Sequence, residues 1–353
     1  HQPENPALQS LLNRDRDVHT TVDIRLQWKA AEILRNRLER THKKGAIVVM
    51  DPRNGDLLAL VSWPAPVDLS NSMPDELLDR ARYGQYPPGS TFKLVTAMAA
   101  LRLNPDVISR TYSCRRLEDG RAGTIIKGWR RPIRDDIGDH PHGSLTLGHA
   151  ITVSCNAYFA QLGVNDVGSK NLKSTAELLE VQTGDLKDLK QMLPFAAYGQ
   201  GPVLTTPFKM ARIAATVAAN GLMPEGRWVS DESNSRTAQG RRVISPDAAL
   251  FLANAMRSVI TNGTARTAMN GLGISLAGKT GTAQLDAGEP HSWFAGFAPY
   301  ETPSGGPPQA QIAFAVVVEH GGYGAQVAAP VARELVEAAQ QLGVIMNHPS
   351  NGR

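Results

Sequence analysis

The sequence has only two cysteines, Cys114 and Cys155, among its 353 residues. Two cysteines are too few for a disulfide framework, and their spacing is not that of a zinc motif. No apolar run approaches the roughly 18 residues needed to cross a bilayer. The chain starts at His1, which does not begin a signal peptide, so we expect any targeting segment to have been removed from this chain.

The sequence also lacks a large excess of either acidic or basic residues. The net charge is +4 and the isoelectric point is near 9.1, and the basic residues are not interleaved with aromatics, which argues against nucleic acid as a partner. One cluster has metal-ligating residue types, but Gly and Pro interrupt it and the spacing is not that of ligands on a helix. We therefore predict a solvated loop, with no metal and no cofactor, at Asp135, Asp136, Asp139, His140 and His142.

Hydrophobic residues make up 42% of the chain, which is ample for a core. Residues 1–19 are polar and irregular, and we predict a tail or linker there, with a second tail at 346–353. Asp23 is a plausible N-cap for the first helix. Apolar residues recur behind it at helical spacing and predict its buried face: Ile24, Trp28, Ala31, Leu34 and Leu38.

The strands fall into an early and a late group with helices between them. Strands are predicted at 46–51, 56–62, 274–284, 292–300 and 311–319. Helices are predicted at 90–101, 145–162, 172–181, 207–219, 246–260 and about 327–342. Residues 110–143 have the composition of a loop.

These elements predict an α+β fold. Two early and three late strands can pair into one five-stranded antiparallel sheet, flanked by the N-terminal and C-terminal helices, with a large helical subdomain inserted. We predict a single domain over residues 20–345. Its sheet part is expected at about 20–88 and 270–345, and its helical part at about 89–269.

The strongest chemical signal is Ser90 at the start of a helix, with Lys93 one turn later. Residues three apart share a helix face, so the hydroxyl and the amine can form a hydrogen bond. Burial lowers the pKa of a lysine until it can act as a base for a serine nucleophile. A Ser-x-x-Lys pair is short enough to occur by chance, so the motif needs companions.

Two companions follow in the chain. Ser154-Cys155-Asn156 lies among the predicted helices, and Lys279-Thr280-Gly281-Thr282 lies in a predicted strand. Each motif occurs on the type of element that its role requires, and the three together predict a serine acyltransferase site. We expect the Lys279 strand to edge the cleft and to face the start of the Ser90 helix.

With these motifs the chain resembles the penicillin-binding proteins, whose transpeptidase domain shares its signature with the serine β-lactamases and D,D-peptidases. The matching stretches are Thr21-Val-Asp-x-x-x-Gln27, Ala46-Ile-Val-Val-Met-Asp-Pro52, Tyr86-x-Pro-Gly-Ser-Thr-Phe-Lys93, His142-Gly143, Ser154-Cys-Asn156, Tyr198-Gly-Gln-Gly201, Gly278-Lys-Thr-Gly-Thr-Ala-Gln284 and Trp293-Phe-Ala-Gly296. The resemblance is to class B members and runs from about residue 20 to residue 342.

The resemblance implies a role for each motif residue. Ser90 would be the acylated nucleophile, Lys93 its base and Ser154 the proton shuttle to the leaving amine. Substrate binding would fall to Asn156, Lys279, Thr280, Gly281 and Thr282. The backbone N–H groups of Ser90 and Thr282 would form the oxyanion hole.

The activity implied is a peptidoglycan D,D-transpeptidase that cross-links stem peptides through a serine acyl-enzyme and is inhibited by β-lactams. Its expected partners are the stem peptides, β-lactam antibiotics, a membrane-embedded glycosyltransferase and other cell-wall synthesis proteins. An extracytoplasmic location is implied, with an anchor outside this chain. Only about 45 residues precede the first strand, so we expect either an excised catalytic domain or a minimal member.

Two alternatives share the acylation chemistry. A hydrolase, either a β-lactamase or a D,D-carboxypeptidase, needs a group that activates water, and a class A β-lactamase would carry Glu-x-x-Leu-Asn after the second motif. A β-lactam-sensing ectodomain or a class D β-lactamase would carry Ser-x-Val and Tyr-Gly-Asn. Asn156 and the Tyr198-Gly-Gln-Gly201 stretch favour the transpeptidase.

Overall fold

The computed structural model describes residues 5–14, 17–230, 240–302, 305–306 and 308–346. Its main sheet has five antiparallel strands in the order β2-β1-β11-β10-β9. The strands are β1 (Gly45–Met50), β2 (Leu57–Trp63), β9 (Ala277–Ala283), β10 (His291–Ala298) and β11 (Ile312–Val318). The predicted α+β fold is confirmed, because β11 pairs with β1 and so joins the late strands to the early hairpin.

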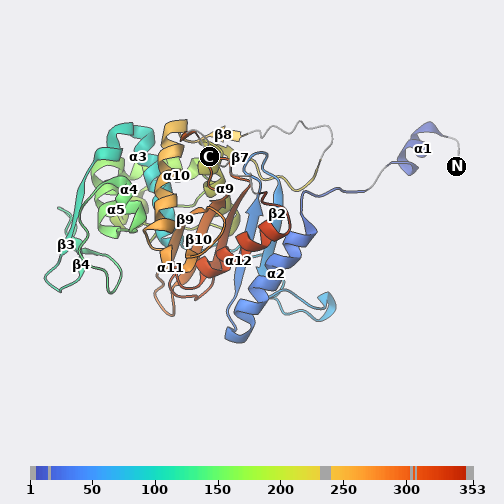
Figure 1. Cartoon of the computed structure of the whole chain (residues 1–353), viewed down its shortest axis with the longest axis horizontal. Helices are drawn as coiled ribbons and strands as arrows, with labels where there is room; N and C mark the ends of the chain where they lie inside the picture. Colours follow the sequence, from blue (N-terminus) through green and yellow to red (C-terminus); the bar gives the residue numbers. More distant parts are fainter. Residues whose placement is uncertain (1–4, 15–16, 231–239, 303–304, 307, 347–353) are drawn as a thin grey trace.

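Helices cover both faces of this sheet (Figure 1). On one face lie α2 (Ile24–Leu38) and α12 (Ala328–Gln341), which pack on each other and on the strands. On the other face α9 (Pro207–Ala218) contacts β1, β10 and β11. Every residue of these three strands is buried, as expected for strands covered on both sides.

The remaining helices lie mainly beside the sheet (Figure 1). They are α3 (Lys93–Leu103), α4 (Leu147–Thr152), α5 (Asn156–Leu162), α6 (Gly168–Leu178), α7 (Leu186–Gln191), α8 (Leu193–Ala196), α10 (Pro246–Thr261) and α11 (Arg266–Met269). α9 falls within the stretch predicted as the helical part, yet it packs on the sheet. The boundary between the two parts remains a prediction.

The N-cap of α2 is confirmed, since the Asp23 carboxylate accepts from the backbone N–H groups of Arg25 and Leu26. Its predicted buried face is wrong at two positions, because Ile24 is 73% exposed and Trp28 is 67% exposed. The helix is rotated so that another stripe, at a compatible helical spacing, faces the sheet. That stripe is Leu26, Ala30, Ile33, Leu34 and Leu38.

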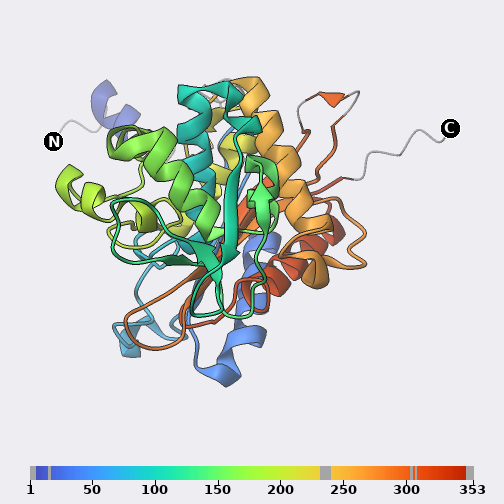
Figure 2. The ribbon, with the colours of Figure 1, turned by 90° about the vertical axis from the view of Figure 1, so that its left-hand side faces the viewer.

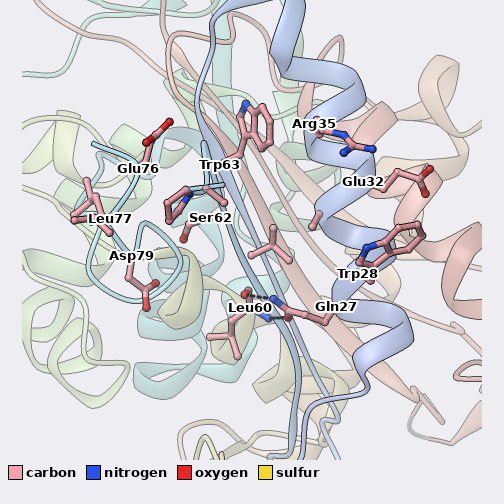
Figure 3. Close-up of a pocket in the computed structure, with 15 residues that line it drawn as sticks. Gln27, Trp28, Glu32, Arg35, Leu60, Ser62, Trp63, Glu76, Leu77 and Asp79 are labelled. Carbon is pink, nitrogen blue, oxygen red and sulfur yellow. Dashed lines mark hydrogen bonds between the residues drawn. The ribbon is translucent and has the colours of Figure 1, made fainter. Parts of the chain in front are cut away.

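The exposed side of α2 forms a groove with the outer edge of β2, with a volume of about 410 Å³ (Figure 3). Gln27 spans the two elements and exchanges two hydrogen bonds of 2.7 Å with the backbone of Leu60. This amide satisfies backbone groups that an edge strand would otherwise leave unpaired.

A short helix, α1 (Pro6–Leu12), forms inside residues 1–19, with Asn5 as its N-cap, so this stretch is not irregular throughout; none of its residues is buried. Of the predicted tail at 346–353, residues 347–353 lie outside the described residues. In the described part of the chain no helix has the length and apolarity needed to span a membrane.

The prediction of a loop over 110–143 is wrong. This stretch forms most of a second, four-stranded sheet with the strand order β5-β4-β3-β6 (Figure 2). The sheet packs beside α5. Its strands are β3 (Tyr112–Arg116), β4 (Ala122–Thr124), β5 (Ile133–Arg134) and β6 (Gly143–Leu145), and a two-stranded ribbon of β7 (Leu222–Pro224) and β8 (Gly240–Arg242) forms elsewhere. Strands this short carry too little alternation to be recognised from sequence.

Candidate active site

The first element of the site is a tight turn that leads into α3. Residues Gly89–Phe92 form a 3-10 helix, and α3 continues directly from it at Lys93. Lys93 is fully buried, and its Nζ lies 2.9 Å from Ser90 Oγ. The predicted contact between hydroxyl and amine is therefore present.

The second element is a break between two helices. One helix was predicted over 145–162, but α4 ends at Thr152 and α5 begins at Asn156. Ser154 lies in the break with φ of 60°, a left-handed conformation that is strained for serine and is often retained at functional sites. This conformation presents the carbonyl and the hydroxyl of Ser154 to Lys93.

Lys93 has several oxygen partners. Its Nζ donates to the Ser154 carbonyl and, over 2.6 Å, to Asn156 Oδ1, and it lies 3.2 Å from Ser154 Oγ. A neutral amine has two N–H groups and one lone pair. If the carbonyl and amide oxygens take the two protons, the lone pair remains available to the hydroxyl of Ser90.

Burial makes the neutral form accessible. Desolvation lowers the pKa of Lys93 to about 8, although the negative charge of Asp135 opposes this change. With this pKa about a tenth of the amine is unprotonated at pH 7 and about half at pH 8, so that Lys93 can accept the proton of Ser90.

The third element is β9, the edge strand of the main sheet on the side opposite β2. It carries Lys279, whose buried Nζ donates to Ser154 Oγ over 2.7 Å. Desolvation and the nearby charge of Lys93 lower the pKa of Lys279. The Ser154 hydroxyl thus lies between the amines of Lys93 and Lys279. It can receive a proton from one of these amines and donate its own proton to a group bound in the cavity.

The backbone of β9 lies against the turn that bears Ser90, as predicted. Gly89 has φ of +52°, and a Cβ there would lie 2.4 Å from the carbonyl oxygen of Thr282. A Cβ on Gly281 would lie 2.8 Å from Thr91 Cγ2 and 3.0 Å from the carbonyl oxygen of Pro88. Only glycine allows so close an approach, which brings the start of the Ser90 turn beside Thr282.

The two threonines of the third motif have different surroundings. Thr282 lines a cavity of about 490 Å³ together with Ser90 and Asn156. Its Oγ1 also accepts from the backbone N–H of Gly324 over 3.2 Å. The Thr280 hydroxyl instead lies 2.6 Å from the hydroxyl of Thr264, a residue that no sequence motif indicated.

The cavity walls carry further polar and aromatic side chains. They include Arg121, Arg134, Phe195, Tyr198, Gln200 and Tyr323. Of these, Tyr198 and Gln200 belong to a stretch on which the family resemblance rests, whereas nothing in the sequence marked the others. They come from parts of the chain that are far apart in sequence, and only folding brings them to one opening.

The interpretation of Asp135 as part of a solvated loop is wrong. Asp135 is only 2% exposed, and its Oδ1 accepts from the backbone N–H groups of Asn156 and, over 3.0 Å, Ala157. The carboxylate thus neutralises the start of α5, where unpaired N–H groups favour an anion. The interaction spans 21 residues, so no local pattern could reveal it.

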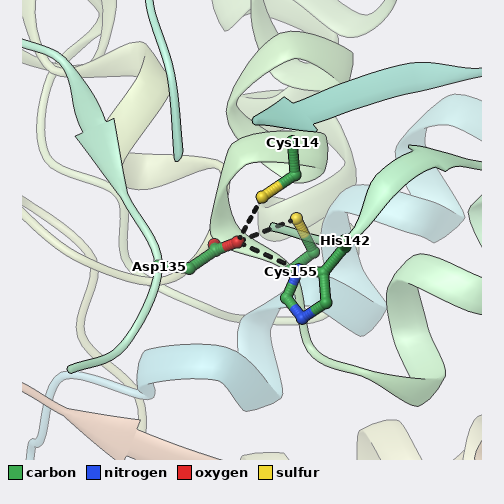
Figure 4. A group of neighbouring side chains, drawn as sticks. All are labelled: Cys114, Asp135, His142 and Cys155. Carbon is green, nitrogen blue, oxygen red and sulfur yellow. Dashed lines mark hydrogen bonds and ion pairs between the residues drawn. The ribbon is translucent and has the colours of Figure 1, made fainter. Parts of the chain in front are cut away.

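Asp135 also contacts Cys114, His142 and Cys155 (Figure 4). The spacing of these residues in the sequence did not indicate that they form one group. Among the described residues these four side chains form a group that could hold a metal ion. His142 is half-buried within it, whereas Asp139 and His140 are exposed as predicted.

Comparisons with known proteins agree with this geometry. The family model of the penicillin binding protein transpeptidase domain matches residues 45–337. The peptidoglycan D,D-transpeptidase PbpA of Mycobacterium tuberculosis is 30% identical over 93% of this chain and 73% of its own length.

Solved structures of transpeptidases of this kind are also similar to the chain. The D,D-transpeptidase domain of a peptidoglycan glycosyltransferase from Eggerthella lenta superposes with a TM-score of 0.76 at 29% identity, over 93% of this chain and 83% of that one. The ceftriaxone acyl-enzyme of penicillin-binding protein A from M. tuberculosis gives a TM-score of 0.74 at 27% identity, over 94% and 83%.

Proposed function

The chain belongs to the penicillin-binding protein transpeptidase family and is a peptidoglycan D,D-transpeptidase, and we propose that Ser90 is its nucleophile and Lys93 its base. The observation that carries the assignment is the 2.9 Å contact between Lys93 Nζ and Ser90 Oγ in a buried setting. A serine hydroxyl reacts only when a base removes its proton, and this amine is the base in contact with it.

Acylation proceeds in balanced steps. Lys93 accepts the hydroxyl proton, and Ser90 Oγ attacks the carbonyl carbon of the bond between the two terminal D-alanines of a stem peptide. The oxyanion that forms accepts from the backbone N–H groups of Ser90 and Thr282. Ser154 then passes a proton to the nitrogen of the departing D-alanine, and the Ser154 hydroxyl is held in place by the hydrogen bond that it accepts from Lys279.

The acyl group then passes to an amine of a neighbouring stem peptide, which regenerates the Ser90 hydroxyl. The third motif, Lys279-Thr280-Gly281-Thr282, borders the substrate on β9, and Thr282 and Asn156 lie at the cavity wall. The Thr280 hydroxyl, which forms a hydrogen bond with the hydroxyl of Thr264, belongs to the same substrate-binding motif. A β-lactam imitates the terminal dipeptide and leaves Ser90 acylated, as in the ceftriaxone complex of the M. tuberculosis relative.

This chemistry also indicates where the protein acts and with which partner. Stem peptides lie outside the cytoplasmic membrane, so we place the chain there, tethered by a segment outside the sequence given. A membrane-embedded glycosyltransferase that polymerises the glycan strands is the expected partner, because transpeptidation consumes its product.

The test follows a labelled penicillin by intact mass. We expect one covalent adduct of one drug mass that persists for many minutes and is absent in Ser90→Ala. Rapid drug loss without an adduct would indicate a β-lactamase. A stem-peptide donor with an amine acceptor then separates the remaining alternatives: cross-linked product supports a transpeptidase, free acid alone a carboxypeptidase, and no product a sensor.

A further inference from the structure

The net positive charge of the molecule is concentrated in the small sheet and its loops. Residues 110–134 contain eight Lys and Arg residues and two Asp and Glu residues, a net charge of +6, whereas the net charge of the whole chain is +4. The basic residues of this stretch are Arg110, Arg115, Arg116, Arg121, Lys127, Arg130, Arg131 and Arg134. The remainder of the chain is therefore slightly acidic, and the excess of positive charge is local to one part of the fold.

Strand pairing places two of these arginines on one face of the sheet. Arg115 of β3 and Arg134 of β5 are both opposite Gly123 of β4, and residues opposite one another on neighbouring strands belong to the same face. Both arginines are exposed, whereas Cys114 and Ile133, each one position away, are buried. The outer face of the sheet therefore presents a guanidinium group on each side of β4.

Much of this positive charge is not neutralised by the protein. Four of the cations are exposed and form no ion pair with another residue that the structure describes: Arg115, Lys127, Arg130 and Arg131. The last three lie in the loop between β4 and β5. The two acidic residues of the stretch lie in the turn between β3 and β4, where Asp119 pairs with Arg134 over 2.6 Å. These four free cations are named the basic surface below, and their field attracts anions.

The basic surface is continuous with the cavity that contains Ser90. Arg121 and Arg134 line that cavity, and Arg134 belongs to the same face of the small sheet as Arg115. A polymer that is held at Ser90 and leaves the cavity on the side of Arg134 therefore lies along the basic surface.

The substrate carries the complementary charge. Each free stem peptide ends in the carboxylate of a D-alanine, so a glycan strand with many stem peptides is a polyanion. Arginine binds a carboxylate through two parallel hydrogen bonds. A single exposed contact of this kind is weak, but several contacts to one strand reinforce each other.

We propose that the basic surface binds stem-peptide carboxylates of the peptidoglycan strand from which one D-Ala-D-Ala end occupies the cavity, and so retains the polymer during acyl transfer. This inference rests on the proposed substrate, but not on the roles proposed for Ser90 and Lys93. An anionic membrane fits this surface less well, because a bilayer on it would lie beside Arg134 and obstruct the cavity that the stem peptide enters.

Binding of the polymer is the direct test. The whole chain carries Ser90→Ala, so that no strand is cross-linked during the measurement, and the probe is a soluble, fluorescently labelled peptidoglycan strand with free stem peptides. Fluorescence anisotropy gives the dissociation constant. We expect binding in about 0.05 M salt that weakens about tenfold or more in about 0.5 M salt, because exposed ion pairs are screened. Conversion of the carboxylates of the strand to amides should weaken binding to a similar extent.

Two matched triple variants locate the binding surface. The first combines Arg115→Gln, Arg130→Gln and Arg131→Gln, and it should bind the strand about tenfold more weakly, since each exposed ion pair contributes about a factor of two. The control replaces three exposed arginines of the N-terminal part in the same way: Arg14, Arg35 and Arg40. The small sheet and α2 lie at opposite ends of the molecule (Figure 1), so the control should bind as tightly as its parent. Equal melting temperatures exclude misfolding.

Retention of the polymer also has a kinetic readout. With Ser90 restored and strands at low concentration, we compare cross-linking of strands with cross-linking of a single stem peptide. The ratio of the two rates should fall about tenfold in the triple variant of the small sheet and stay constant in the control.

Three outcomes overturn the proposal. They are equal losses of strand binding in the two triple variants, strand binding that conversion to amides leaves unchanged, and binding to vesicles of anionic phospholipid in place of strands, which would make a membrane the partner. None of these measurements of binding involves catalysis, so their failure leaves the assignment of Ser90 intact. That assignment fails separately if Ser90→Ala still takes up labelled penicillin.

Discussion

Lys279 donates a hydrogen bond of 2.7 Å to the hydroxyl of Ser154, across 125 residues of sequence. Lys93 contacts the same hydroxyl from the helical side at 3.2 Å. The edge strand of the sheet and the break between α4 and α5 therefore meet at one oxygen atom.

Ser154→Ala should slow acylation by penicillin about 100-fold or more at saturating drug, with little change in initial binding, because a proton shuttle acts in the transition state. Stopped-flow measurement of acylation against drug concentration separates the two constants. Ser154→Gly is the matched variant, since it also lacks the hydroxyl but accepts φ of 60° without strain. Equal slowing in both variants assigns the effect to the hydroxyl, and an unaltered rate removes Ser154 from the mechanism.

Acylation should depend on pH through Lys93. Its pKa is lowered to about 8 by burial, and only the neutral amine accepts a proton. The rate should therefore rise about tenfold per pH unit below pH 8 and level off above it. Measurement of the acylation constant from pH 6 to 9.5 checks this, and a flat profile over that interval contradicts the assignment of Lys93 as base.

Arginine at position 93 should not replace lysine. A guanidinium remains protonated and cannot accept the hydroxyl proton of Ser90, so Lys93→Arg should acylate as slowly as Lys93→Ala, at least about 1000-fold below the wild type. Intact mass after timed exposure to penicillin gives the rates. Rapid acylation of Lys93→Arg would show that another group activates Ser90.

Gly89→Ala tests the fit of β9 against the Ser90 turn. The new Cβ would lie 2.4 Å from the Thr282 carbonyl oxygen, so we expect a loss of about 1–3 kcal/mol in the free energy of unfolding and strongly impaired acylation. Denaturant unfolding and penicillin labelling measure the two effects.

Gly271→Ala is the control, because Gly271 has φ of +75° with nothing within 4 Å of a Cβ. It should cost about 1 kcal/mol from backbone conformation alone and leave acylation intact. Equal effects at both positions would show that the contact with Thr282 is unimportant.

Much of the molecule could be predicted from local sequence. Four of the five strands of the main sheet, β1, β2, β10 and β11, are rich in apolar residues, and Asp23 caps α2 as its side-chain chemistry predicts. The Ser90 and Lys93 pair could be predicted because helical periodicity alone puts residues three apart on one face. The short strands of 110–143 and the exposed position of Trp28 could not be predicted, because tertiary packing overrides weak local preferences.

The sequence by itself determined the three motifs, the elements that carry them and the family to which they belong. Only the tertiary structure decided that Lys93 and Lys279 share Ser154, that Thr280 pairs with Thr264, and that Asp135 is buried beneath Asn156. These contacts join residues from about 16 to more than 120 positions apart, as the separation of each pair shows. Local propensities act over a few residues, whereas such pairs form only when packing and desolvation bring distant segments together.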